Sequence, residues 1–137
     1  MNVKLTWTGA VAFVGETDAG HRIVIDGPEE NGGRNLGPRP METLLIGMGA
    51  CTAYDVVSIL QKGRQQMDAC QIAINSVRAE EHPKVFTEIQ VHFTFSGTDL
   101  KPKQIERAIE LSSEKYCSAS IMLGKTAKIT HSYEILD

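Results

Sequence analysis

The longest apolar segment of the chain is PMETLLIGMGACTAYDVVSILQKG, residues 40–63. Pro40 stands at its start, where proline favours the first helical position, and Gly63 after Lys62 is a helix stop signal. When residues 41–60 are placed on a helix, their apolar side chains cover well over half of its circumference. The sequence therefore predicts a helix that is buried on most sides.

The remaining arc of this helix carries small and polar residues, namely Gly47, Cys51, Tyr54, Asp55, Ser58 and Lys62. Cys51 on such a stripe is either a reactive thiol or a small core residue, since free cysteines are commonly buried. Asp55 lies one turn further on the same face, and a nearby carboxylate raises the pKa of a thiol. Both interpretations of Cys51 stay open at this point.

Alternating polar and apolar residues predict strands at 3–8, 71–79, 85–95 and 126–135, and turn residues mark two shorter strands at 11–14 and 23–25. In residues 85–95 the inward face is Ile89, Val91, Phe93 and Phe95. Residues 26–39 are rich in glycine and proline and predict a long loop, a kind that is often functional or mobile.

Pro102 begins a second, amphipathic helix, whose apolar stripe is Ile105, Ala108, Ile109, Ser112 and Tyr116 and is closed by Cys117. Ser118 is expected to cap a short helical run at 119–123. The element order β-β-β-α-β-β-α-β predicts an α+β fold with antiparallel sheets. The length of 137 residues predicts one domain spanning 1–137.

Composition excludes several classes of function. There are 14 Lys+Arg against 17 Asp+Glu, and this net charge of −3 leaves no electrostatic footprint for nucleic acid or an anionic membrane. No run reaches the ~18 apolar residues of a membrane span. The N-terminus lacks an apolar signal core, so a cytoplasmic location is expected. Three cysteines without a C-x-x-C pattern predict neither a disulfide framework nor a zinc site; no metal or cofactor is expected.

The other cysteines and the histidines differ in how well they fit a functional role. Cys117 lies at a helix junction, where the N–H groups of the following turn would favour a thiolate, although a core role is the open alternative. Cys70 has no polar constellation around it and is interpreted as structural. His131 shares a strand face with apolar residues and is expected in a core or interface, whereas the other histidines, His21, His82 and His92, are expected to be solvated.

Three passages resemble the OsmC/Ohr family of osmotically inducible and organic hydroperoxide resistance proteins. Residues 38–45 running into Gly49-Ala50-Cys51-Thr52 resemble its first cysteine motif, and residues 114–118 resemble its second. Residues 130–134 look like the end of its final strand. Residues 52–62 look most like the YhfA-type branch, and the resemblance covers essentially the whole chain.

The resemblance implies an intertwined homodimer with two long central helices wrapped by six-stranded sheets. It also implies that Cys51 is the peroxidatic cysteine and Cys117 the resolving one, with a small hydroperoxide as substrate and a lipoyl-type dithiol as reductant. The family's assisting glutamate corresponds here to Met41, with Glu42 one residue later. The assisting arginine belongs near residues 9–15, which contain none, so Arg34 or Arg39 would have to supply the charge.

The sequence therefore predicts a thiol-dependent redox protein, a hydroperoxide reductase that works through a sulfenic acid and a disulfide. Because the assisting arginine and glutamate are missing, slow peroxide reduction is expected. The alternative is a non-catalytic domain that keeps the fold and binds a small apolar molecule or a partner. The candidate lining of such a pocket is Met41, Leu44, Leu45 and Met48.

Overall fold

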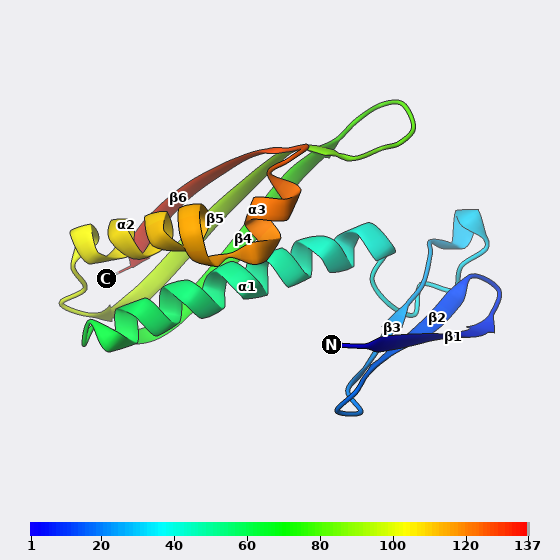
Figure 1. Ribbon diagram of the computed structural model, residues 1–137, viewed down its shortest axis with the longest axis horizontal. Coiled ribbons are helices and arrows are strands. Elements are labelled where there is room, and N and C mark those ends of the chain that lie inside the picture. Colours follow the sequence, from blue (N-terminus) through cyan, green and yellow to red (C-terminus); the bar gives the residue numbers. More distant parts are fainter. Residues whose placement is uncertain (137) are drawn as a thin grey trace. The chain divides into compact units, whose positions relative to one another are not determined.

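The computed structural model describes residues 1–136, and the chain divides into two compact units, residues 1–46 and the part from Gly47 onward. Helix α1 (Pro40–Lys62) begins in the first unit and continues through the second (Figure 1). The chain contains both helices and strands, and the strands form two separate three-stranded sheets. This confirms the predicted α+β class.

The first unit holds an antiparallel meander, as predicted. Its strands are β1 (Val3–Gly9), β2 (Ala12–Thr17) and β3 (Arg22–Ile25), in that order across the sheet. Two tight turns connect them. Gly9 and Gly20 adopt positive φ angles of 112° and 88°, which only glycine reaches without strain, so both turns use the residues from which they were predicted.

The long loop at residues 26–39 is organised around one carboxylate. Asp26 is only 1% exposed, and its side chain accepts the backbone N–H groups of Gly27, Arg34 and Leu36 at 2.7, 3.1 and 3.2 Å. A Cβ on Gly33 would lie 2.0 Å from the Gly27 carbonyl oxygen, so the loop closes on itself at a glycine. Between them lies a short 3₁₀ turn, η1 (Glu29–Asn31). The segment expected to be functional or mobile is thus a hydrogen-bonded structural turn.

The second unit contains a mixed sheet of β4 (Gln66–Arg78), β5 (Phe86–Thr98) and β6 (Lys128–Leu136), in the order β4-β5-β6. Strands β4 and β5 are antiparallel, but β5 and β6 are parallel. The expectation of purely antiparallel sheets was therefore wrong for this pair. A helical crossover joins β5 to β6, and such a connection allows parallel pairing. Alternation within one strand carries no information about the direction of its neighbour.

The crossover consists of α2 (Pro102–Leu111), a π-helical turn η2 (Ser112–Tyr116) and α3 (Ser118–Leu123). The predicted apolar stripe holds as far as Ser112, which is fully buried, but Tyr116 is 50% exposed. The π turn explains this correction, because the Cys117 N–H reaches back five residues to the Ser112 carbonyl at 2.8 Å. The wider turn brings Cys117 inward, where it is 0% exposed.

The core of the second unit lies between the sheet and the helices. The predicted inward face of β5 is confirmed, since its four apolar side chains are at most 1% exposed. Helix α1 contributes Met48, Val56 and Leu60, which are equally buried. Gly49 lets α1 approach β4, because a Cβ there would lie 2.9 Å from Ile74 Cδ1. Figure 1 shows α1 and α2 on the same face of this sheet.

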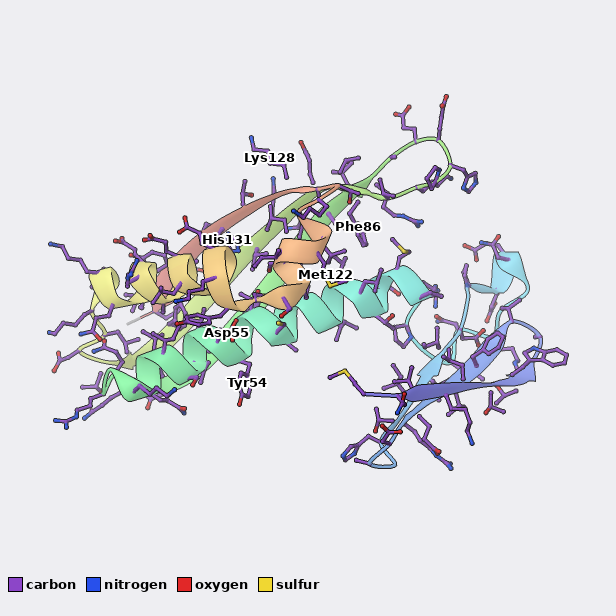
Figure 2. The ribbon with its side chains drawn as sticks, in the orientation of Figure 1. Tyr54, Asp55, Phe86, Met122, Lys128 and His131 are labelled. Atoms are coloured by element: carbon purple, nitrogen blue, oxygen red, sulfur yellow. The ribbon has the colours of Figure 1, made fainter. Side chains whose placement is uncertain are left out.

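The opposite side of α1 is uncovered in the single chain. Tyr54 is 78% exposed and points away from the sheet (Figure 2). By length and composition alone, α1 could cross a membrane, with a mean hydropathy of 1.6, which corrects the expectation that no segment reaches this level. The core helix of a globular fold satisfies the same criterion, and Met48, Val56 and Leu60 are buried under the sheet. Only 28% of the apolar window is buried, however, so the prediction of a helix buried on most sides is wrong for the single chain, which offers α1 a sheet on one side only.

Candidate thiol site

Two of the three cysteines meet where α1 faces the junction of η2 and α3. Cys51 and Asp55 lie one turn apart on α1, and Cys117 comes from the junction. The two Sγ atoms and a carboxylate oxygen of Asp55 all lie within 4.8 Å of one another. Neither cysteine is in a disulfide. The fold therefore brings together the two thiols that the family resemblance pairs, with a carboxylate beside them.

Cys117 is surrounded by hydrogen-bond donors. Its Sγ accepts the Thr52 hydroxyl at 3.1 Å, the Ser120 hydroxyl at 3.0 Å and the Ser120 backbone N–H at 3.4 Å. The last bond makes Cys117 itself the N-cap of α3, a position expected for Ser118. The correction has a simple cause, because the cap must accept an N–H and the π turn points this sulfur toward it.

These donors decide the acidity of Cys117. Its burial acts to raise the pKa of the thiol, but the Ser120 and Thr52 hydroxyls and the Ser120 N–H stabilise the thiolate more strongly. The pKa therefore lies below its ordinary value. The N–H contribution agrees with the interpretation of Cys117 as a junction thiol. The hydroxyl of Thr52 escaped sequence reasoning, because it lies 65 residues away in the chain.

Cys51 has the opposite character. It is half-buried, and its burial is the main cause that raises the pKa of its thiol. The neighbouring Cys117 and the Asp55 carboxylate raise it further, while a hydrogen bond from the Ala119 N–H lowers it in part. The predicted effect of Asp55 is thus confirmed in direction. Of the two thiols, Cys51 is the one that solvent reaches and Cys117 is the more acidic.

Asp55 is held in place by the same crossover segment. The fully buried Ser112 hydroxyl donates to Asp55 Oδ2 at 3.0 Å. Figure 2 shows Asp55 and Tyr54 on opposite sides of α1, with Asp55 directed toward the helical crossover and Tyr54 away from it. The carboxylate is consequently a fixed neighbour of both sulfurs.

The charged residues considered as assistants form bonds within the first unit. Arg39 donates to Asn35 Oδ1 at 2.9 Å and to the Gly37 carbonyl at 3.1 Å, and Glu42 accepts the Arg39 backbone N–H at 2.8 Å. Arg34 Nη2 reaches the Gly9 carbonyl at 3.5 Å. Each of these side chains therefore has a structural role in its own unit.

The remaining candidates belong to the framework. Cys70 lies within β4 opposite Phe95, and burial raises the pKa of its thiol. His131 is half-buried and stacks on Phe93 at a centroid distance of 6.5 Å, and burial lowers its pKa. This half-burial and the stacking agree with the expectation of a core or interface histidine. Of the proposed apolar lining, Met48 is a core residue of the second unit, whereas Leu44 is 47% exposed.

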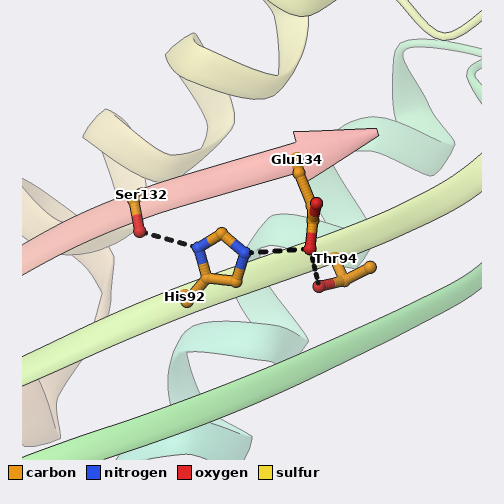
Figure 3. Close-up of polar contacts among 4 residues, drawn as sticks. All are labelled: His92, Thr94, Ser132 and Glu134. Atoms are coloured by element: carbon orange, nitrogen blue, oxygen red, sulfur yellow. Dashed lines mark hydrogen bonds and ion pairs between the residues drawn. The ribbon is translucent and has the colours of Figure 1, made fainter. Parts of the chain in front are cut away.

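A second polar cluster lies on the outer face of the sheet (Figure 3). His92 Nδ1 lies 2.7 Å from Ser132 Oγ, its Nε2 lies 3.3 Å from Glu134 Oε1, and Thr94 donates to that same oxygen at 3.3 Å. The parallel register places His92 opposite Ser132 and Thr94 opposite Glu134. His92, which was expected to be solvated, thus also bridges two strands. With side chains 39% and 54% exposed, His92 and Glu134 form a surface network rather than a shielded reaction site.

The chain belongs to the OsmC-like protein family. Residues 32–132 match the family model for OsmC-like protein. The chain is also 47% identical over 136 residues to protein YhfA of Escherichia coli K12, which covers 99% of this chain and 98% of YhfA. The resemblance found in the two cysteine motifs is thereby confirmed over the whole length.

Solved structures agree with the fold. A hypothetical protein from Aquifex aeolicus is 32% identical with a TM-score of 0.87, and the match covers 98% of this chain and 95% of that one. An organic hydroperoxide resistance protein OsmC from Legionella pneumophila has a TM-score of 0.69 at 16% identity, over 98% and 97% of the two chains. At that identity the Legionella protein supports the fold alone.

Proposed function

We propose that this protein is a thiol-dependent redox protein that reduces small organic hydroperoxides through Cys51 and Cys117. The observation that carries the proposal is the pair of sulfurs within 4.8 Å of each other, with one accessible and the other stabilised as a thiolate. Family membership supports it, as does the likeness in fold to a protein described as conferring organic hydroperoxide resistance.

The two thiols take different roles because they differ in access and acidity. Cys117 is wholly buried, so a hydroperoxide meets Cys51 first. The Cys51 sulfur lies within 4.8 Å of the Cys117 sulfur, and the Cys117 thiolate opposes the ionisation of Cys51 and raises its pKa. Because Cys117 is the more acidic thiol, it is a poor base for Cys51, and the Cys51 proton leaves to solvent.

The cycle balances with three participants. The Cys51 thiolate attacks the terminal oxygen of the hydroperoxide, the O–O bond breaks, and the leaving alkoxide takes a proton from water to become an alcohol. The Cys117 thiolate next attacks the Cys51 sulfenic acid, which forms the disulfide and releases water after protonation. A dithiol of the lipoyl type returns both cysteines to thiols and is itself oxidised to a disulfide. Sulfur carries both electrons, so the cycle requires no metal or flavin.

The raised pKa of Cys51 slows the first step. Burial is its main cause, and Cys117 and the Asp55 carboxylate add to it, so the attacking thiolate forms less readily. A single missing stabiliser of developing charge typically costs on the order of 10²–10³ in rate. We therefore expect peroxide reduction that is slow beside family members that carry the assisting arginine and glutamate.

A second copy of the chain is the partner in this proposal. The exposed side of α1 includes Tyr54, and α3 exposes Met122, which is 72% accessible (Figure 2). Obligate homodimers cover such surfaces with interfaces of roughly 2,000 Å² or more. Light scattering at micromolar concentration is expected to give twice the chain mass; a monomer would contradict this part of the proposal. The cytoplasm, where dithiols are kept reduced, suits the cycle.

The decisive experiment is a titration of the reduced, metal-free protein with cumene hydroperoxide, followed by intact mass. One equivalent should remove about 2 Da per chain as the disulfide forms. Cys51→Ser and Cys117→Ser should abolish this loss, whereas the matched control Cys70→Ser should retain it. Dihydrolipoate should then reverse the change. A loss of mass that depends on Cys70, or no loss at all, would overturn the proposal.

A further inference from the structure

The Cys51, Asp55 and Cys117 cluster has a property that peroxide chemistry does not use. Two side chains of α1 and one from the junction of η2 and α3 present two sulfurs and one carboxylate oxygen within 4.8 Å of one another. We propose that these three side chains form a binding site for Zn²⁺ in the reduced protein. The proposal goes beyond the redox cycle, because it concerns the thiol form in the absence of any peroxide.

The donor set fits zinc in both chemistry and size. Thiolates favour borderline and soft cations, whereas Mg²⁺ and Ca²⁺ require shells of oxygen. Zinc–sulfur bonds of about 2.3 Å in tetrahedral geometry place two sulfurs about 3.8 Å apart. The separation of at most 4.8 Å here requires an adjustment of about 1 Å or less. Rotation of the half-buried Cys51 side chain can supply it.

The scaffold holds two of the ligands in place. Ser112 donates to Asp55 Oδ2 and so orients the carboxylate, whose two oxygens leave further lone pairs for a cation. Thr52 and Ser120 hold Cys117 Sγ through their hydroxyls at 3.1 and 3.0 Å. Metal ligands in proteins are typically oriented by such outer hydrogen bonds. The buried hydroxyls around this cluster are therefore already arranged as a supporting shell.

Three protein ligands leave one tetrahedral position for water or a small external ligand. The half-buried Cys51 and Asp55 lie on the accessible side of the cluster, and the fully buried Cys117 lies on the inner side. The fourth position consequently opens toward solvent, an arrangement typical of reactive or exchangeable zinc rather than of closed structural sites. The sequence predicted no metal, because Cys51 and Cys117 lie 66 residues apart without a recognisable ligand spacing.

The test uses the full-length, reduced, metal-free protein under anaerobic conditions, with Co²⁺ as a spectroscopic probe. One Co²⁺ per chain should produce sulfur-to-cobalt charge-transfer absorption and the intense visible bands of tetrahedral cobalt. One equivalent of Zn²⁺ should bleach both. Zinc-loaded protein should also resist alkylation of Cys51 by iodoacetamide. Absence of the charge-transfer bands, or bands without tetrahedral intensity, would overturn the proposal.

Variants separate this site from adventitious binding. Cys51→Ser and Asp55→Asn should each weaken binding at least tenfold, as should Cys117→Ser, while Cys70→Ser should bind like the native chain. Ser112→Ala should weaken binding by about 10–100-fold through loss of the outer bond to Asp55. If Cys117→Ser fails to fold by circular dichroism, the half-buried Cys51 and Asp55 variants still decide the question. Unchanged binding in those two variants would overturn the zinc site and leave the peroxide titration of metal-free protein unaffected.

Discussion

Asp26 and Cys117 are both buried groups that accept three hydrogen bonds, yet their donors differ. Asp26 receives three backbone N–H groups from its own loop. Cys117 receives one backbone N–H and two hydroxyls, one of them from α1. In both cases these bonds lower the pKa of the acceptor, with the Gly27 N–H as the main cause for Asp26.

The difference in donors matches a difference in role. Backbone N–H groups are fixed by the chain, so the three bonds to Asp26 determine the shape of the loop and suit a carboxylate that stays ionised near neutral pH. Hydroxyl groups rotate and can both donate and accept. They suit Cys117, whose charge changes during disulfide formation. The comparison predicts that damage at Asp26 appears in stability, and damage at Cys117 in thiol chemistry.

The largest effect is expected for Asp26→Ala, because it leaves the N–H groups of Gly27, Arg34 and Leu36 without an acceptor. The urea midpoint should fall more than for any other variant here, and those three amides should lose protection in hydrogen exchange. Because the pKa of Asp26 is lowered on folding, its stabilisation exists above its ordinary value of 3.8 and is lost as the pH falls through the folded pKa. Unchanged protection of these amides would contradict the structural role assigned to Asp26.

The next effect concerns the hydroxyls at Cys117. Ser120→Ala and Thr52→Val should each raise the pKa of Cys117, because each removes a donor to the thiolate, and the double variant should raise it further. Each should cost about 1 kcal/mol of stability. The measurement is a pH titration of thiolate absorbance in a chain that carries both Cys51→Ser and Cys70→Ser, so that Cys117 is the thiol that titrates. The matched control is Ser113→Ala, because among the described residues the Ser113 hydroxyl donates to the Glu110 carbonyl alone. A Cys117 titration that both variants leave unmoved would contradict the assigned role.

A smaller effect is expected for Asp55→Asn. Removing the carboxylate lowers the pKa of Cys51, but burial, the largest cause of the upward shift, remains. Alkylation of Cys51 near neutral pH should therefore accelerate only severalfold. Glu88→Gln, an exposed change of the same type on the outer face of β5, serves as the control. Slower alkylation in Asp55→Asn would show that the carboxylate acts as a base for the thiol rather than as a repulsive charge.

The smallest effect is expected at His131, a half-buried side chain whose Nε2 is buried and lacks hydrogen bonds of the kind that Asp26 and Cys117 receive. Its Nε2 has no hydrogen-bond partner among the described residues, and burial lowers its pKa. Because the unfolded chain binds this proton more readily, stability should decline as the pH falls below about 6.5 and through the folded pKa. Comparison of urea midpoints at pH 7 and about pH 5.5 checks this. His131→Phe should reduce the difference between the urea midpoints at these two pH values. An unchanged difference would mean that another group causes the pH dependence.

Predictions from sequence patterns were correct where a feature depends on residues that lie close together in the chain. The period-two pattern of β5 correctly placed Ile89, Val91, Phe93 and Phe95 inside, because strand geometry alone alternates the faces. The helical signals at Pro40 and Gly63 bounded α1 to within a few residues. The acidity of Cys117 followed in part from the turn that comes directly after it. The pairing of Cys51 with Cys117 came only from the resemblance to a family.

The sequence by itself determined the element order, the inward face of β5 and the carboxylate beside Cys51, since each depends on spacing along one helix or strand. The tertiary structure alone decided the parallel partner of β5, the burial of Cys117 beside an exposed Tyr116, and the bond from Thr52 to the Cys117 sulfur. Propensity and periodicity extend over about one or two turns, whereas these features depend on how distant segments meet. The chemistry of the thiol pair therefore belongs to the fold, because its donors lie up to 65 residues from the sulfur that they stabilise.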